Sequence, residues 1–221
     1  ARLVPRRNRA GRLVPRLERR RLVAVLGSLD QFSPPLWLEA VRQGLLQAAC
    51  VVWLSDGATG LWGLFDDRLA PYAHGVLDFY HAAQQLWRAA KVWLDGRTRS
   101  AHAWFGQARH RLRHGQSKAV LDELLTVMNL PDLPTTTRDT LARVYRYLDK
   151  HRDHIQYERF KDMDLPIGSG LVESACKWLI QQRFKGVGMR WGEQSFTYLL
   201  LLRLAWVNGR FDDCFPSSPN L

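Results

Sequence analysis

The chain has 221 residues, 46% of them apolar, so it can bury a core, and no run reaches the roughly 18 uncharged apolar residues that a membrane span requires. Three widely spaced cysteines, Cys50, Cys176 and Cys214, argue against a disulfide framework and a zinc knuckle, and they fit a reducing cytoplasm. The net charge of +11 and the pI near 10.1 favour a polyanionic partner, above all a nucleic acid.

Residues 1–21 are predicted to be a basic, arginine-rich tail. They hold nine arginines against the single Glu18, so they carry a net charge of +8 and leave only +3 for the rest of the chain. A solvated tail therefore explains much of the pI by itself. The tail repeats "RLVPR" with prolines that discourage a continuous helix, and it lacks both a starting methionine and a secretory signal. We expect that the chain begins inside a longer reading frame.

Residues 22–80 are predicted to be an α/β segment. The run "RLVAVLG" at residues 21–27 is typical of a strand, and "PPLWLEAVRQGLLQA" at residues 34–48 has the proline start and apolar spacing of a helix. A buried strand is expected at residues 50–54, a short helix from about Thr59, and a second strand within residues 74–81.

This alternation of strand, helix and strand predicts a parallel βαβ unit. Functional groups of such units gather at the carboxyl ends of the strands. Asp56 and Asp78 both fall there. Asp56 precedes Gly57, and Asp-Gly is a common turn dipeptide, so a turn without chemistry is the alternative interpretation.

A helical insertion is predicted over residues 81–161, where the apolar period becomes helical and a break at residues 129–137 separates the last two helical runs. Residues 162–211 should form the closing helices, which are two helices joined by a glycine-rich basic turn. Residues 212–221 are a tail. The apolar run at residues 196–207 is interpreted as a buried helix, because Arg203 interrupts it.

Glu173 is the first candidate site residue. It follows "PIGSG" in the first turn of a predicted apolar helix, where a carboxylate can serve an ordinary capping role. The same helix dipole keeps the carboxylate ionised, and Gly168 and Gly170 allow a phosphate or a backbone to come close. An ionised, oriented carboxylate also suits a hard cation such as Mg²⁺.

The stretch "QRFKGVGMRW" at residues 181–191 is the candidate DNA-binding segment. Arg183, Lys185 and Arg190 flank its glycines, and Trp191 closes it. Positive charge, open backbone and a stacking ring suit a nucleic-acid backbone. A surface loop with a buried tryptophan anchor is an equal alternative.

Two other matches carry less weight. "SACK" at residues 174–177 fits an S-x-x-K pattern, but no S-D-N or K-T-G accompanies it. His110 and His114 have the spacing of a zinc-binding pair without the glutamate of H-E-x-x-H, so a solvated basic face is favoured.

Four blocks of the chain resemble the Kra-type insertion-sequence transposases of bacteria, relatives of the Mutator-like DDE transposases. The blocks are "LSDGATGLW" (residues 54–62), "LDFYHAAQQLW" (77–87), "PIGSGLVESACKWLIQQRFKGVGMRW" (166–191) and "LLLRLAWVNGRF" (200–211). Their order and spacing cover nearly all of the chain after about Arg21, and the third block is long and specific.

The resemblance implies an α/β, predominantly helical fold with a partial ribonuclease-H-like (DDE) core and a helical insertion. It matches Asp56 to the family's second catalytic aspartate and Glu173 to its terminal glutamate, both as metal ligands. Asp78 and His81 resemble the element that follows the second aspartate, in a supporting role; a polar pair that fixes a strand-to-helix junction is the alternative.

The implied function is that of a DNA transposase fragment, a metal-dependent phosphoryl transferase that cleaves and joins DNA ends. Carboxylates would hold a pair of Mg²⁺ (or Mn²⁺) ions roughly 4 Å apart. The partners would be the transposon ends and target DNA, and the protein could act as a homo-oligomer on DNA in the bacterial cytoplasm, at the nucleoid.

The sequence departs from the family pattern at the first catalytic aspartate. Only Asp30 lies upstream of Asp56, and it follows a Gly-Ser turn and precedes "QFSPP", which does not suit a central strand. We therefore expect this chain to lack the first strand and to be inactive alone. Two alternatives stay open: a catalytically dead, basic DNA-binding remnant, and a helical scaffold whose carboxylates only cap helices and turns.

Overall fold

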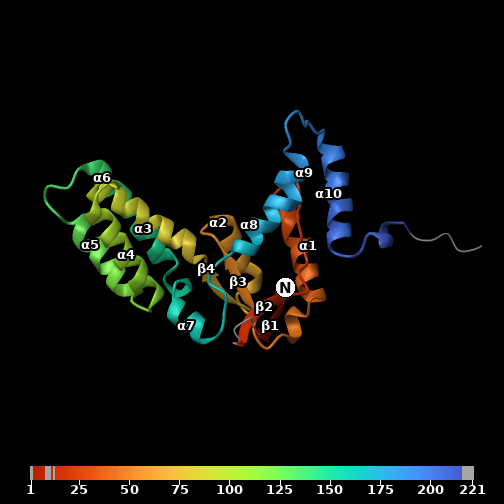
Figure 1. The fold of residues 1–221 in the computed structure, drawn as a ribbon, viewed down its shortest axis with the longest axis horizontal. Coiled ribbons are helices and arrows are strands. Elements are labelled where there is room, and N and C mark those ends of the chain that lie inside the picture. The colour runs from red at the N-terminus through yellow and green to blue at the C-terminus, as the bar shows by residue number, and fades with distance from the viewer. Residues whose placement is uncertain (1, 8–10, 12, 216–221) are drawn as a thin grey trace, which may run out of the picture. The chain divides into compact units, whose positions relative to one another are not determined.

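The computed structural model describes residues 2–7, 11 and 13–215, which are predominantly helical (Figure 1). They divide into two compact units. The first unit comprises Ala1–Ala49 with Gly170–Leu221, and the second comprises Cys50–Ser169. No described helix is long and apolar enough to cross a membrane.

The second unit begins with the predicted βαβ arrangement. Strands β3 (Val52–Ser55) and β4 (His74–Leu77) pair in parallel, with Val52 opposite His74 and Ser55 opposite Leu77. Between them lie α2 (Thr59–Leu64) and a π-helical turn, η2 (Phe65–Leu69). Parallel strands need such a crossover because their ends point the same way. The predicted strands, the helix from Thr59 and their parallel pairing are confirmed.

The rest of the second unit is helical, as predicted. Its elements are α3 (Phe79–Leu94), α4 (Arg99–Arg113), α5 (Ser117–Met128), α6 (Thr135–Lys150), η3 (Arg152–His154) and α7 (Tyr157–Asp162). Helix α3 packs against α4 and α6, and α5 packs against α4 and α6. Their buried faces carry alanines and leucines such as Ala82, Leu86, Leu112, Leu124 and Leu141. The last helical run is interrupted at His151, where η3 separates α6 from α7.

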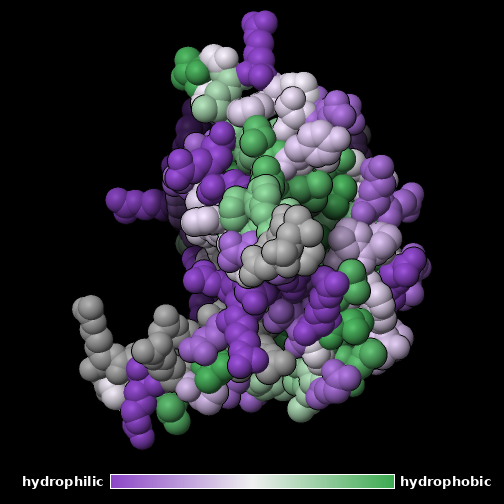
Figure 2. Space-filling model, turned by 90° about the vertical axis from the view of Figure 1, so that its right-hand side faces the viewer, coloured by the Kyte–Doolittle hydropathy of each residue, from purple (hydrophilic) through white to green (hydrophobic). Residues whose placement is uncertain are grey.

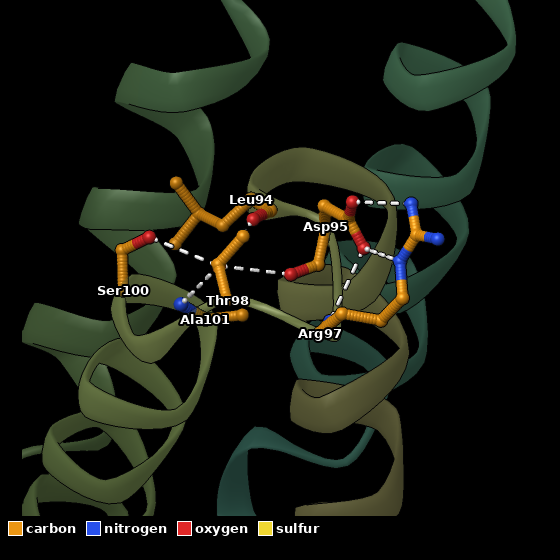
Figure 3. A network of polar contacts seen from close by, with 6 residues as sticks. All are labelled: Leu94, Asp95, Arg97, Thr98, Ser100 and Ala101. Carbon is orange, nitrogen blue, oxygen red and sulfur yellow. Dashed lines mark hydrogen bonds and ion pairs between the residues drawn. The ribbon is translucent and has the colours of Figure 1, made fainter.

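The turn between α3 and α4 illustrates how these helices are separated (Figure 3). Asp95 ends α3 with a positive φ of 55°, and its carboxylate accepts hydrogen bonds from the backbone and guanidinium of Arg97. Thr98 then caps α4 by accepting a hydrogen bond from the Ala101 amide. A threonine side chain at this position satisfies an amide that has no partner within the helix.

The first unit opens with two strands, β1 (Arg2–Arg7) and β2 (Leu13–Glu18), which pair antiparallel. Helix α1 (Leu29–Arg42) and the short η1 (Leu45–Gln47) follow. Helix α1 begins five residues before the predicted start. Ser28 and Gln31 form a reciprocal capping box there, and Pro34 and Pro35 lie inside the helix.

The strand predicted at residues 21–27 is wrong, because the structure has no strand there. Leu22 donates its backbone amide to Asn208 Oδ1 (2.9 Å) and accepts from Asn208 Nδ2 (2.8 Å) at its carbonyl oxygen. A buried side-chain amide thus makes the hydrogen bonds that a neighbouring strand would make. Leu22 and Ala24 pack against an apolar cluster that includes Leu200 and Leu204.

The closing segment contains α8 (Gly170–Cys176), the π-helical η4 (Lys177–Gln181), α9 (Gln182–Phe184), α10 (Glu193–Val207) and η5 (Asp212–Cys214). The two predicted helical regions and the turn between them are confirmed. Arg203 donates hydrogen bonds to the carbonyl oxygens of Trp178 and Leu179. The charged residue within the apolar run thus bonds backbone oxygens of the preceding helical segment.

Helix α10 is not buried as predicted. Leu200 and Leu204 face the apolar cluster, whereas Tyr198, Leu201 and Trp206 are exposed. Hydrophobic side chains gather among hydrophilic ones on the side of the molecule that carries α10 (Figure 2). A helix that is apolar all round normally has both faces covered. One face of α10 is covered by the described residues of its own unit.

Candidate functional site

The carboxyl edge of the parallel pair β3–β4 brings together two of the predicted site residues. Asp56 follows β3 and Asp78 follows β4, and the Asp78 amide donates to the Ser55 carbonyl oxygen at 2.8 Å. The register that places Ser55 opposite Leu77 therefore continues to the two aspartates. Both lie where the strand, helix and strand pattern predicted them.

Asp78 is fixed in place by its own chain. It is 1% exposed and is the N-cap of α3. Its Oδ1 accepts from the His81 amide at 2.9 Å, and its Oδ2 accepts from the Ser169 amide at 2.5 Å. Burial raises its pKa, but hydrogen bonds from Ser169 and His81 outweigh this and hold the pKa below the ordinary value. Asp78 thus connects the strand end, the helix start and the segment before Gly170.

His81 lies beside this carboxylate. Its Nδ1 is 3.1 Å from Asp78 Oδ1, although this nitrogen has no hydrogen-bond partner of good geometry among the described residues. Asp78 and His81 thus fix the junction at which β4 ends and α3 begins. A supporting role in catalysis for the pair stays a prediction.

Asp56 has a different environment. Its Oδ1 accepts from the Ala58 amide at 3.1 Å, which closes an Asx turn, and its backbone oxygen accepts from Trp62 Nε1 at 2.7 Å. Among the described residues nothing donates to its Oδ2. The backbone oxygen and one carboxylate oxygen of Asp56 are therefore hydrogen-bonded, while the other carboxylate oxygen has no assigned partner.

Tyr147, on α6, is a neighbour of Asp56 that the sequence did not single out. A Cβ added to Gly57 would lie 2.2 Å from the Tyr147 ring, so the turn after Asp56 can approach α6 only because residue 57 is a glycine. Burial, together with the negative charge of Asp56, raises the pKa of Tyr147 to about 12. The phenol is therefore neutral at physiological pH and can donate a hydrogen bond toward this edge.

The outer edge of β4 is covered by side chains of the helical segment. His154 Nδ1 lies 3.0 Å from the Gly75 carbonyl oxygen, and Tyr157 Oη donates to the Leu77 carbonyl oxygen at 3.0 Å. The amides of His74 and Asp78, by contrast, donate to the carbonyl oxygens of Val51, directly before β3, and of Ser55, at its end. Both backbone edges of β4 are therefore occupied, and no described strand pairs with the other edge of β3.

Glu173 belongs to the first unit, whereas Asp56 and Asp78 belong to the second. Helix α8 begins at Gly170, so Glu173 is its fourth residue and lies in the first turn with an exposed side chain. The position near a helix N-terminus is the one predicted. That Glu173 and Asp56 share a metal ion stays a prediction.

The basic turn is defined here as Arg183, Lys185, Arg190 and Trp191. Its three cationic side chains are exposed and have no ion pair among the described residues. Trp191 donates from Nε1 to the Phe184 carbonyl oxygen at 3.0 Å and packs edge-on against the Phe184 ring, yet it remains 40% exposed. The tryptophan anchors the turn and still presents part of its ring to solvent.

A metal fits this donor set only in part. Among the described residues, no three His, Cys, Asp or Glu side chains gather as a metal-binding group. Asp56 offers one carboxylate oxygen that no described group contacts, whereas both oxygens of Asp78 are engaged by backbone amides. A hard cation at this edge would therefore be held by Asp56 and by a further carboxylate from elsewhere.

Comparisons of the chain with protein-family models, with curated proteins and with solved structures found no match.

Proposed function

We propose that the chain belongs to a DNA transposase of an insertion sequence, with a ribonuclease-H-like core that carries out metal-dependent phosphoryl transfer on DNA ends. The observation that carries this proposal is the position of Asp56. It directly follows a strand of a parallel pair. Its carboxylate Oδ1 accepts from the Ala58 amide and its backbone oxygen accepts from Trp62 Nε1, whereas its other carboxylate oxygen has no described partner. Ligands of α/β sheets bind at this edge.

In the proposed reaction, Asp56 and Glu173 hold Mg²⁺ or Mn²⁺, which would activate water or a 3′-hydroxyl and stabilise the leaving oxygen. Asp78 is assigned no metal in this proposal, because it is buried and each of its oxygens already accepts from a backbone amide. It instead fixes Ser169, which directly precedes the helix of Glu173. Asp78 is thus a positioning residue for the segment that leads to Glu173.

DNA is held in this proposal by the basic turn. Its cations have no carboxylate partners among the described residues, so they can contact phosphates without first breaking an ion pair. The partly exposed Trp191 offers a face for an unpaired base. If the chain only binds DNA, it would make the same DNA contacts, but Asp56 and Glu173 would not hold a catalytic metal ion.

The metal site is tested by paramagnetic broadening of amide signals with Mn²⁺. In the wild-type chain we expect selective broadening at Gly57 and Ala58 and around Glu173. The variant Asp56→Asn should lose it. Asp67→Asn is the matched control, because Asp67 is an exposed carboxylate of the same unit that lies outside the proposed site.

Two results would count against this assignment. Broadening that is equally strong in Asp56→Asn would mean that Mn²⁺ binds elsewhere. Broadening absent from the wild type, in a chain that still binds DNA, would favour the catalytically dead DNA-binding alternative.

A further inference from the structure

The structure assigns a second phosphate-binding element to this protein: we propose that Arg109 and Arg113, on the last turns of α4, contact the backbone of DNA beside the carboxyl edge of β3–β4. The inference rests on the proposed DNA function and locates a contact that the basic turn does not provide. Both arginines and the ring that they contact belong to the second unit.

Both guanidinium groups lie over the same aromatic ring. Arg109 Cζ and Arg113 Cζ are each 5.6 Å from the centroid of the Phe79 ring. Phe79 is buried and begins α3 directly after Asp78. The ring thus holds two cations at the end of β4, one residue from the site aspartate.

Neither of these two cations makes an ion pair among the described residues. Arg97 and Arg111, the neighbouring arginines, pair with Asp95 and Glu123. No acidic residue occurs between Asp95 and Asp122, so α4 itself cannot supply one. Like charges four residues apart on a helix destabilise each other. An anion that bridges them would remove this cost.

Another explanation is that cations near a helix C-terminus interact favourably with the helix dipole. That effect accounts for positive charge in the last turn of α4 but not for two guanidiniums converging on one ring. Guanidinium groups match phosphate oxygens in a fork geometry, and a supporting ring restricts their orientation. Tyr80, which is 57% exposed and packs edge-on against Phe79, adds an aromatic surface beside them. Arginines with an exposed ring suit a nucleic-acid backbone.

The test is the salt dependence of DNA binding by the full chain, measured by fluorescence anisotropy with a labelled duplex. The variant is Arg109→Gln with Arg113→Gln. If each arginine contacts one phosphate, the slope of log K against log salt should fall by about 1.8, and affinity at 0.1 M salt should fall by roughly 60-fold.

The matched control is Arg97→Gln with Arg99→Gln. It removes the same charge, and Arg99 lies about 15 Å along the same helix from Arg109. We expect its salt slope to stay close to that of the wild type. Because Arg109 and Arg113 also cover Phe79, Arg109→Lys with Arg113→Lys is the second variant, and thermal unfolding of all variants is followed by circular dichroism. The lysine variant should retain most of the slope.

The outcomes separate the two proposals. A wild-type chain that does not bind DNA overturns both the proposed function and this inference. A wild-type chain that binds, with equal slopes in the glutamine variant and its control, overturns this inference alone. A fall in slope confined to Arg109→Gln with Arg113→Gln, in a protein that unfolds at the wild-type temperature, supports it.

Discussion

Lowering the pH should destabilise the second unit through His151. This side chain is 3% exposed and packs against the rings of Trp62, at 4.8 Å between centroids, and Tyr147, at 5.4 Å. Burial, together with the positive charges of His154 and Lys150, lowers the pKa of His151 to about 4 from the ordinary 6.5. The folded protein therefore keeps this imidazole neutral where the unfolded chain protonates it.

The sign and size follow from this difference. Between pH 6.5 and 4 the unfolded state binds one more proton than the folded state, so the free energy of unfolding falls as the pH falls. Above pH 6.5 both states are neutral and nothing is lost. At 1.36 kcal/mol for each pKa unit, the loss from His151 approaches about 3 kcal/mol at pH 4.

The assay is urea unfolding at several pH values between 7 and 4, followed by circular dichroism. The difference in unfolding free energy between the wild type and His151→Phe isolates this residue from the carboxylates that also titrate. The wild type should lose about 3 kcal/mol more than the variant over this range. His110→Gln, which replaces an exposed histidine, is the control. Its free energy of unfolding should change with pH as that of the wild type does. Parallel curves for the wild type and His151→Phe would contradict the lowered pKa of His151, as would an imidazole pKa near 6.5 measured by NMR.

Three further predictions concern the turn after Asp56, the segment around Leu22 and the basic turn. Gly57→Ala should destabilise the second unit by about 1–3 kcal/mol in urea unfolding, because the new methyl would overlap Tyr147, whereas Gly63→Ala, with open space, should not. Asn208→Ala should lower the free energy of unfolding by about 1–3 kcal/mol, since it leaves two backbone groups of Leu22 without partners. An unchanged midpoint of urea unfolding would contradict this. Replacing the three cations of the basic turn by glutamine should lower the salt slope of DNA binding by up to about 2.7. Replacing the three arginines at residues 19–21 by glutamine should lower it by less. Equal effects would mean that the net charge of the chain, and not the basic turn, determines DNA binding.

Much of the second unit could be predicted from the sequence because its signals are local. The apolar run before Asp56 and the one before Asp78 are short and end at polar residues, and the structure has strands at both. The alanine and leucine spacing after Tyr80 is helical, and α3 follows it. Asp56 and Asp78 could be placed at one edge because parallel strands end on the same side.

The first unit was predicted less well because its structure depends on distant contacts. The segment at residues 21–27 has the composition of a strand, but it is bonded by the side chain of Asn208. Only the tertiary structure reveals such a partner. The start of α1, however, had a visible signal: Ser28 followed three residues later by Gln31 is a capping box. The prediction instead began the helix at Pro34, because proline is common at the first helical position.

The residues near the candidate site that the sequence did not indicate come from other helices of the second unit. Tyr147 reaches the turn after Asp56 from α6, and Arg109 and Arg113 reach Phe79 from α4. No spacing along the chain could pair them. The stretch without acidic residues between Asp95 and Asp122 was a usable signal for the arginines.

The decisive measurement for the proposed DNA function is binding of the full chain to a DNA duplex across about 50 to 300 mM salt. Both the transposase proposal and the arginine pair require contacts to phosphates. We predict binding whose log K falls linearly with log salt, with a slope of about 4–5 if the three cations of the basic turn and the two arginines of α4 each contact one phosphate. Binding that is absent at low salt, or that does not change with salt, would contradict it.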